Sequence, residues 1–97
     1  GQNGQDNWDI LDSAKNENGY FWWFHLKSFP SSHVIVKVEK MTKELLVYAA
    51  ELCKNSTKYK NMKKLYVNYT QCNNVIKDGP IGSVCFKSNR KIKSIMV

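Results

Sequence analysis

The chain has 97 residues and a formal net charge of +7, which is enough for one small domain with its own core and too little for two. No window approaches the roughly eighteen apolar residues of a membrane span, and the start shows no secretory leader pattern, so we expect no membrane partner. Three cysteines without C-x-x-C spacing favour a reducing compartment over a disulfide framework, and we expect a cytoplasmic location.

The positive charge is concentrated in one part of the chain. Residues 54–97 carry nine lysines and Arg90 against one acid, Asp78, whereas residues 1–18 carry four acids against Lys15. A basic half of this kind is typical of proteins that bind nucleic acid or a ribosome surface through phosphate contacts. Fourteen lysines with ten asparagines are, however, also the composition that an AT-rich genome favours. Both interpretations stay open on composition alone.

Residues 1–19 are mostly polar, with one short apolar island. We predict a short helix over residues 7–14, capped by Asp6 or Asn7 and ended by the turn sequence at residues 16–19. This helix precedes the most distinctive part of the chain.

That part is residues 20–34, YFWWFHLKSFPSSHV, which hold five of the seven Phe and Trp residues and both histidines. Bulky rings pack well on a pleated surface, so residues 20–26 are predicted to form a strand. Residues 29–32 break this strand, and residues 33–39 resume with period-two alternation. The stretch therefore predicts a β-hairpin.

The pairing register of this hairpin decides which side chains form the core. If residue 25 lies opposite residue 33, one face is almost entirely apolar, because successive strand side chains point to opposite faces. This predicted core face carries Tyr20, Trp22, Phe24, Val34, Val36 and Val38. The other face carries Phe21, Trp23, His25, His33, Ile35 and Lys37. A slip of one residue would put the two histidines on opposite faces, so the register is testable.

A second helix is predicted from an N-cap at Thr42 to about Lys54. Its apolar face carries Leu45, Leu46, Ala49, Leu52 and Cys53, which makes Cys53 a core residue. A basic loop follows, and it is either a surface that stacks bases and binds phosphates or a solvated connection. Its members are Tyr59 and the lysines Lys58, Lys60, Lys63 and Lys64.

Further strands are predicted at residues 65–70, 75–77, 82–87 and 91–97, the last two as a hairpin around residues 88–90. Strands before and after one good helix predict an α+β fold. We expect a mainly antiparallel β-sheet of about five strands, with one principal amphipathic helix packed on it.

Catalytic chemistry has little support in the sequence. Two histidines on one strand face, with Lys37 nearby, suit a ribonuclease-like acid and base, but residues 20–38 contain no Asp or Glu to orient an imidazole. The histidines and cysteines also lack metal-ligand spacing, and no glycine-rich phosphate loop is present. We therefore predict no catalytic residue, no metal and no cofactor, with His25 in a structural role and His33 in contact with a ligand.

An ordered series of short motifs runs through the chain. It consists of Trp23-Phe24-His25, Ser32-His33-Val34, Ala49-Ala50 with Ser56, Val67-x-Tyr69-Thr70, Lys77, and Gly82 with Val84, after an opening with Gly1, Asn3, Asn7 and Ile10. This series resembles the NFACT-R domain family over essentially the whole chain. Gln2 and the short segment 78–81 depart from the family pattern. The resemblance implies that residues 1–97 are a single NFACT-R-like domain, and we expect a fragment of a longer protein.

The resemblance implies a non-catalytic RNA-binding module that contacts tRNA or rRNA on the large (60S) ribosomal subunit in ribosome-associated quality control. The small stand-alone members of the family suggest an alternative, a DNA-sensing or protein-interaction module that precedes a coiled coil. RNA and the large ribosomal subunit are the implied partners, with no small-molecule substrate.

We expect the nucleic-acid-binding surface to lie at the edge of the aromatic hairpin. Its expected members are Lys27, Ser32, His33, Lys37, Lys77 and Arg90, with Trp23 and His25 as supporting residues. The four lysines of the basic loop form a second expected patch.

Overall fold

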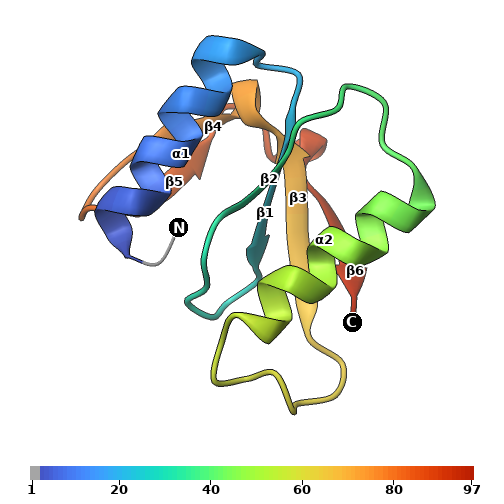
Figure 1. The fold of residues 1–97 in the computed structure, drawn as a ribbon. Helices are drawn as coiled ribbons and strands as arrows, with labels where there is room; N and C mark the ends of the chain where they lie inside the picture. The colour runs from blue at the N-terminus through green and yellow to red at the C-terminus, as the bar shows by residue number, and fades with distance from the viewer. Residues whose placement is uncertain (1–2) are drawn as a thin grey trace.

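The computed structural model describes residues 3–97, so the expectations on Gly1 and Gln2 lie outside the described residues. This part of the chain has two α-helices and six strands, and its fold is α+β as predicted. Figure 1 shows α2 crossing in front of the main sheet and α1 lying at one side of it. No helix within the described residues combines the length and the apolar character that a membrane crossing requires.

The first helix, α1, runs over Gly4–Glu17 and is longer than predicted. Its N-cap is Asn3, whose side-chain oxygen accepts the backbone N–H of Asp6 at 2.9 Å. The predicted caps were therefore wrong, because Asn3 offers the same capping chemistry one turn earlier. Asn7 lies inside the helix and is buried, together with Leu11 and Ala14.

The main sheet is antiparallel and has the strand order β2-β1-β3-β6. These strands span Val34–Val36, Trp22–Leu26, Tyr66–Gln71 and Lys93–Met96, respectively. Strand β1 pairs with β2 so that Trp22 lies opposite Val36 and Phe24 opposite Val34. The predicted hairpin register is confirmed. Tyr20 precedes the strand and is exposed, so its place in the predicted core was wrong.

The second helix, α2, runs over Lys43–Asn55 and packs on one face of this sheet. Thr42 caps it as predicted, since its Oγ1 accepts the Leu45 N–H at 3.2 Å. The core beneath α2 joins Phe24, Val67 and the fully buried Cys53, with Trp22, Val34 and Val36 packed against it. Leu52 was expected in this core but is 43% exposed.

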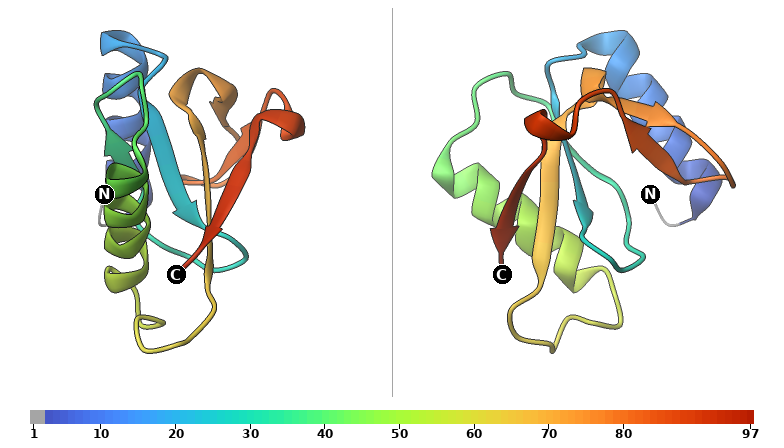
Figure 2. Two further views of the ribbon diagram at one scale, coloured as in Figure 1. Left: turned by 90° about the vertical axis from the view of Figure 1, so that its right-hand side faces the viewer. Right: turned by 180° about the vertical axis from the view of Figure 1, so that it is seen from behind.

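The predicted C-terminal hairpin was wrong. Strand β5 (Val84–Phe86) pairs with β4 (Val75–Lys77) in a separate two-stranded sheet, whereas β6 pairs with β3. The buried Asn74 fixes this path, because its amide donates to the Ser88 carbonyl and accepts the Ser88 N–H. A short 3-10 helix over Asn89–Lys91 then turns the chain back to β3. Figure 2 shows β4 and β5 beside α1.

The hairpin face opposite α2 is also largely covered. A second core joins Trp23 to Leu11 and Ala14 of α1 and to Cys72 and Val75. Phe21, Ile35, Val84 and Phe86 pack against this cluster. The aromatic hairpin therefore lies between two cores, and most of its rings serve packing.

Candidate nucleic-acid interface

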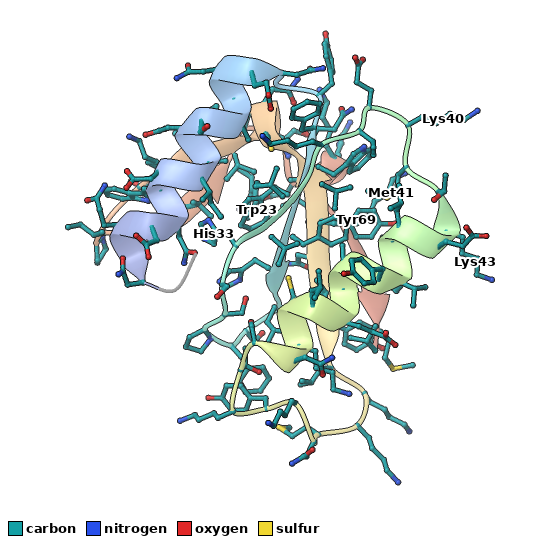
Figure 3. All side chains as sticks on the ribbon, in the orientation of Figure 1. Trp23, His33, Lys40, Met41, Lys43 and Tyr69 are labelled. Atoms are coloured by element: carbon teal, nitrogen blue, oxygen red, sulfur yellow. The ribbon has the colours of Figure 1, made fainter. Side chains whose placement is uncertain are left out.

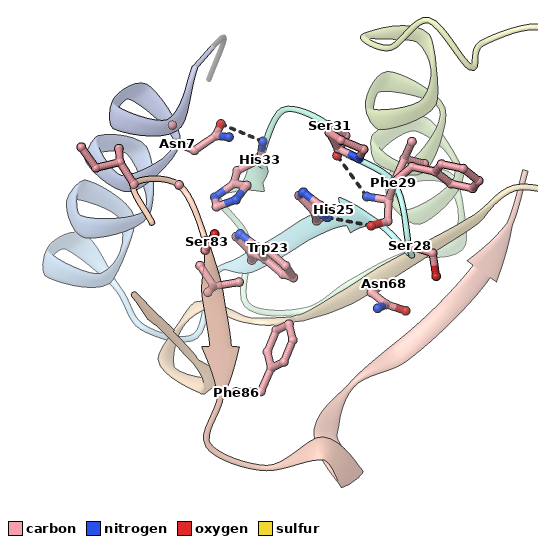
Figure 4. A pocket seen from close by; sticks show the side chains of 16 residues that line it. Asn7, Trp23, His25, Ser28, Phe29, Ser31, His33, Asn68, Ser83 and Phe86 are labelled. Atoms are coloured by element: carbon pink, nitrogen blue, oxygen red, sulfur yellow. Dashed lines mark hydrogen bonds between the residues drawn. The ribbon is translucent and has the colours of Figure 1, made fainter. Parts of the chain in front are cut away.

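Three rings from the hairpin meet where the second core ends. Trp23 and His25 lie two residues apart on β1 and therefore point to the same face, where their rings stack at 5.7 Å between centroids. His33, just before β2, packs edge-on against both, at 5.2 Å from Trp23 and 5.3 Å from His25. The predicted pairing of residues 25 and 33 thus brings the two histidines together. Figure 4 shows these rings at one wall of a cavity.

The cavity measures about 540 Å³, within the range of small-molecule sites. Its other walls come from the β1–β2 loop, from Asn68 of β3, from residues 81–84 with Phe86, and from the first turns of α1. Within the part of the chain that the structure describes, every lining side chain is uncharged at neutral pH. The site therefore favours a neutral, hydrogen-bonding group over a phosphate.

Two glycines allow the cavity wall to form. Gly82 has φ +94°, a conformation that side chains with a Cβ rarely adopt. A Cβ added to Gly82 would also lie 2.6 Å from the Cα of Gly4 in α1. The segment before β5 can approach α1 this closely only because both positions are glycine.

Burial favours the neutral form of both histidines. Burial lowers the pKa of His25, partly offset by the bond from Nδ1 to the Leu26 carbonyl at 2.7 Å. Because a carbonyl only accepts, Nδ1 carries the proton and Nε2 is left as an acceptor. Burial also lowers the pKa of His33, to about 4, with a further contribution from the nearby His25 and opposition from backbone bonds to Asn7 and Gly82.

Two features that a ribonuclease-like pair requires are not found beside these histidines within the described residues. A ribonuclease-like pair needs a third group that orients an imidazole or stabilises developing charge. No carboxylate and no lysine lines the cavity within the described residues, and Lys37 is paired with Glu17 at 3.1 Å. The indole N–H of Trp23 is buried and has no hydrogen-bond partner among those residues.

The cations expected at the hairpin edge are not brought together. Lys27 follows β1 and Lys37 follows β2, so they lie at opposite ends of an antiparallel pair. Lys37 and Lys77 form ion pairs with Glu17 and Asp12 of α1, the second at 2.8 Å. Two of the expected binding lysines thus have carboxylate partners on α1.

The other expected members are also dispersed. Arg90 is exposed on the 3-10 helix after β5, beside a separate cavity of about 320 Å³. His33 is only 2% exposed, and its backbone N–H donates to Asn7 Oδ1 at 3.0 Å. Ser32 is half-buried and lines a second cavity of about 550 Å³. Trp23 forms a buried wall and His25 a partly accessible one.

The second expected patch has a different character. All four lysines of the basic loop, residues 56–65 between α2 and β3, are exposed, and none pairs with a carboxylate of the described residues. Figure 3 shows side chains of this loop extending away from the fold. Tyr59 packs on Phe29 of the β1–β2 loop at 4.5 Å, and Lys58 lies over the Tyr59 ring at 5.4 Å. The basic loop is thereby joined to the loop that lines the cavity.

Sequence patterns could not have predicted the cavity, because its walls come from distant segments. Asn68 and Ser83 carry no local signal of their own. Asn7 does belong to the quoted motif series, but a capping role was the simpler local explanation for it. The basic loop carried a compositional signal, and its position next to the cavity depends on the contact between Phe29 and Tyr59.

The chain is similar to one described protein family and to a solved structure. Residues 1–88 match the family model described as the NFACT protein RNA binding domain. Among solved structures, the chain is similar to the C-terminal part of a fibronectin/fibrinogen-binding protein from Streptococcus suis, with a TM-score of 0.85 and 26% sequence identity. That similarity covers 100% of this chain and 38% of the other. A search of the curated proteins gives no match.

Proposed function

Because the chain belongs to the family of NFACT protein RNA-binding domains, we propose that this RNA-binding module contacts tRNA or rRNA on the large ribosomal subunit. The proposed setting is ribosome-associated quality control, in which the module recognises RNA without catalysing a reaction.

The observation that carries this proposal is the basic loop. Four exposed lysines lie within the seven residues 58–64, and no carboxylate of the described residues pairs with them. Lysines in this state attract phosphates and displace the counterions condensed on the nucleic acid, and this release supplies a large share of the affinity for its backbone. Lys37 and Lys77 are paired with carboxylates of α1, whereas the lysines of the basic loop are not. We therefore place the contacts with the RNA backbone at the basic loop.

The cysteines support a cytoplasmic setting, which we propose with it. Cys53, Cys72 and Cys85 are unpaired, and two of them are buried. Free buried thiols are usual in a reducing compartment, where disulfides are rare.

The test is a titration of labelled tRNA and of isolated large ribosomal subunits at several salt concentrations. Binding should weaken as salt rises, because phosphate contacts release counterions. Duplex DNA serves as the competitor. A stronger preference for DNA than for tRNA would favour the DNA-sensing alternative, and affinity without salt dependence would contradict backbone recognition.

A further inference from the structure

One face of the main sheet is covered by α2, and the opposite face is partly open. Side chains alternate along each strand, and Val67 and Tyr69 of β3 belong to the core under α2. Tyr66 and Asn68 therefore point to the other side. The pairing of β3 with β1 and β6 places the neighbours of these two residues on the same side. This open face consists of His25, Lys27, Tyr66, Asn68, Ser94 and Met96.

The open face is accessible to solvent at the end where β3 begins and β6 ends. Tyr66 is 49% exposed and Met96, which lies opposite it on β6, is 50% exposed. Figure 2 shows the lower part of β3 and β6 with no helix over the side that faces away from α2. At its upper end, the face continues into the 540 Å³ cavity, which His25 and Asn68 both line.

We propose that this open face binds an unpaired segment of RNA, with one base stacked on Tyr66 and the next held in the cavity beside His25 and Asn68. The inference rests on the proposed function, since it names the part of the RNA that the module reads.

The first support is the chemistry of the cavity. Asn68 Oδ1 accepts the Ser94 hydroxyl at 2.7 Å, which leaves the amide N–H groups of Asn68 as donors. The protonated Nδ1 of His25 is bonded to the Leu26 carbonyl, which leaves Nε2 as an acceptor. A donor and an acceptor among uncharged walls match the edge of a nucleobase. They do not match a phosphate, which needs cations or converging N–H groups.

The second support is the distribution of charge around the face. Lys27 Nζ lies 5.9 Å from the centroid of the Tyr66 ring, within the distance of a cation–π interaction. From this position, the ammonium group can also pair with a phosphate of a strand bound on the open face. Lys63 and Lys64 lie three and two residues before Tyr66, and both are exposed. Charged groups thus lie at the margin of the face, and uncharged groups lie within it. This is the pattern of a site that stacks bases and tracks the backbone.

The geometry also favours an unpaired strand. Tyr66 and Asn68 are two residues apart on one strand, so they are separated by about 7 Å along it. Bases in a duplex are stacked on one another and cannot lie flat on a protein ring. Those in loops and single-stranded ends can be splayed onto aromatic side chains.

The test compares one labelled RNA sequence as a single strand and as a duplex, by fluorescence anisotropy. Tyr66→Ala should weaken single-strand binding about 5- to 150-fold, the range of one stacked base, while duplex binding changes little. Tyr66→Phe keeps the ring and should lie nearer to the original chain than Tyr66→Ala does. Tyr48→Ala is the matched control, because Tyr48 is an exposed tyrosine (62%) on α2, away from the open face.

Each outcome is informative. Equal single-strand affinities for Tyr66→Ala and Tyr48→Ala would overturn the inference, and so would equal losses for single strand and duplex. If the unmodified chain binds tRNA through the basic loop but Tyr66→Ala has no effect, only this inference fails. If the unmodified chain binds no RNA of either form, the proposed function fails with it. Thermal unfolding of each variant verifies that the exposed substitutions leave the fold intact.

Discussion

Asn7 and His33 are joined across the fold, because the side-chain oxygen of Asn7 accepts the backbone N–H of His33 at 3.0 Å. Both residues are buried, and both line the cavity. The bond ties α1 to the start of β2 and holds the wall that carries the two histidines. A polar residue inside an otherwise apolar helix face is thereby accounted for.

Asn7→Ala should reduce the free energy of unfolding by about 1–3 kcal/mol, the cost of leaving a buried N–H without a partner. The free energy of unfolding is measured by urea denaturation, from the midpoint of the transition and its dependence on urea concentration. Asn16→Ala, at an exposed position of the same helix, is the control and should stay within about 0.5 kcal/mol. Equal effects of the two substitutions would show that the Asn7–His33 bond contributes nothing to stability.

His33 should make the fold sensitive to acid. Its pKa is about 4 in the folded chain, against 6.5 as its ordinary value. Between these two pH values the unfolded chain binds a proton that the folded chain does not, so stability falls as the pH falls. When the pH has fallen to the folded-state pKa of His33, this group has lowered the free energy of unfolding by about 3 kcal/mol.

The variant His33→Gln lacks this titrating group. Comparing it with the unmodified chain separates the effect of His33 from that of the carboxylates, which titrate in both chains. Urea unfolding of both chains at neutral and at mildly acidic pH gives the measurement. The unmodified chain should lose more stability on acidification than His33→Gln does. Parallel losses in the two chains would mean that His33 is not held neutral in the folded state.

The three cysteines should differ in reactivity. Burial raises the pKa of Cys53 to about 12 and that of Cys72 to about 11, whereas Cys85 is only half-buried. Since the thiolate is the reactive form, alkylation of the folded chain should modify Cys85 first. Cys53 and Cys72 should react only after denaturant is added. Peptide mass spectrometry distinguishes the three sites, and equally rapid labelling of Cys53 would contradict its place under α2.

Much of the fold follows from local sequence patterns. The register of β1 and β2 could be predicted because only one pairing gives an apolar face, and Thr42 could be identified as a cap because its chemistry is local. The start of α1 was misplaced because Asn3 and Asn7 offer the same capping chemistry, and only burial against His33 distinguishes them. The partner of β5 was misassigned because the bonds of Asn74 to Ser88 connect positions fourteen residues apart.

The arrangement of the expected site residues could not be predicted from the sequence, for an electrostatic reason. Lys37 and Lys77 look like free cations in the sequence, but α1 brings Glu17 and Asp12 against them. Aromatic density suggested a binding platform in the hairpin, yet the hairpin lies between two cores. The accessible ring that remains on the sheet is Tyr66, from a strand without aromatic clustering. The sequence therefore indicated RNA as the class of partner, while the positions of these side chains depended on tertiary pairing.

The most direct test of RNA binding through the basic loop is the salt dependence of tRNA affinity for two double variants that change charge equally. Lys63→Glu with Lys64→Glu should weaken binding and flatten the slope of log affinity against log salt by at least about 1.4, because each lost phosphate contact removes about 0.7–0.9. Lys37→Glu with Lys77→Glu, at lysines paired with α1, should change affinity and slope much less. Equal losses in the two variants, or a greater loss in the second, would contradict placing the RNA backbone at the basic loop.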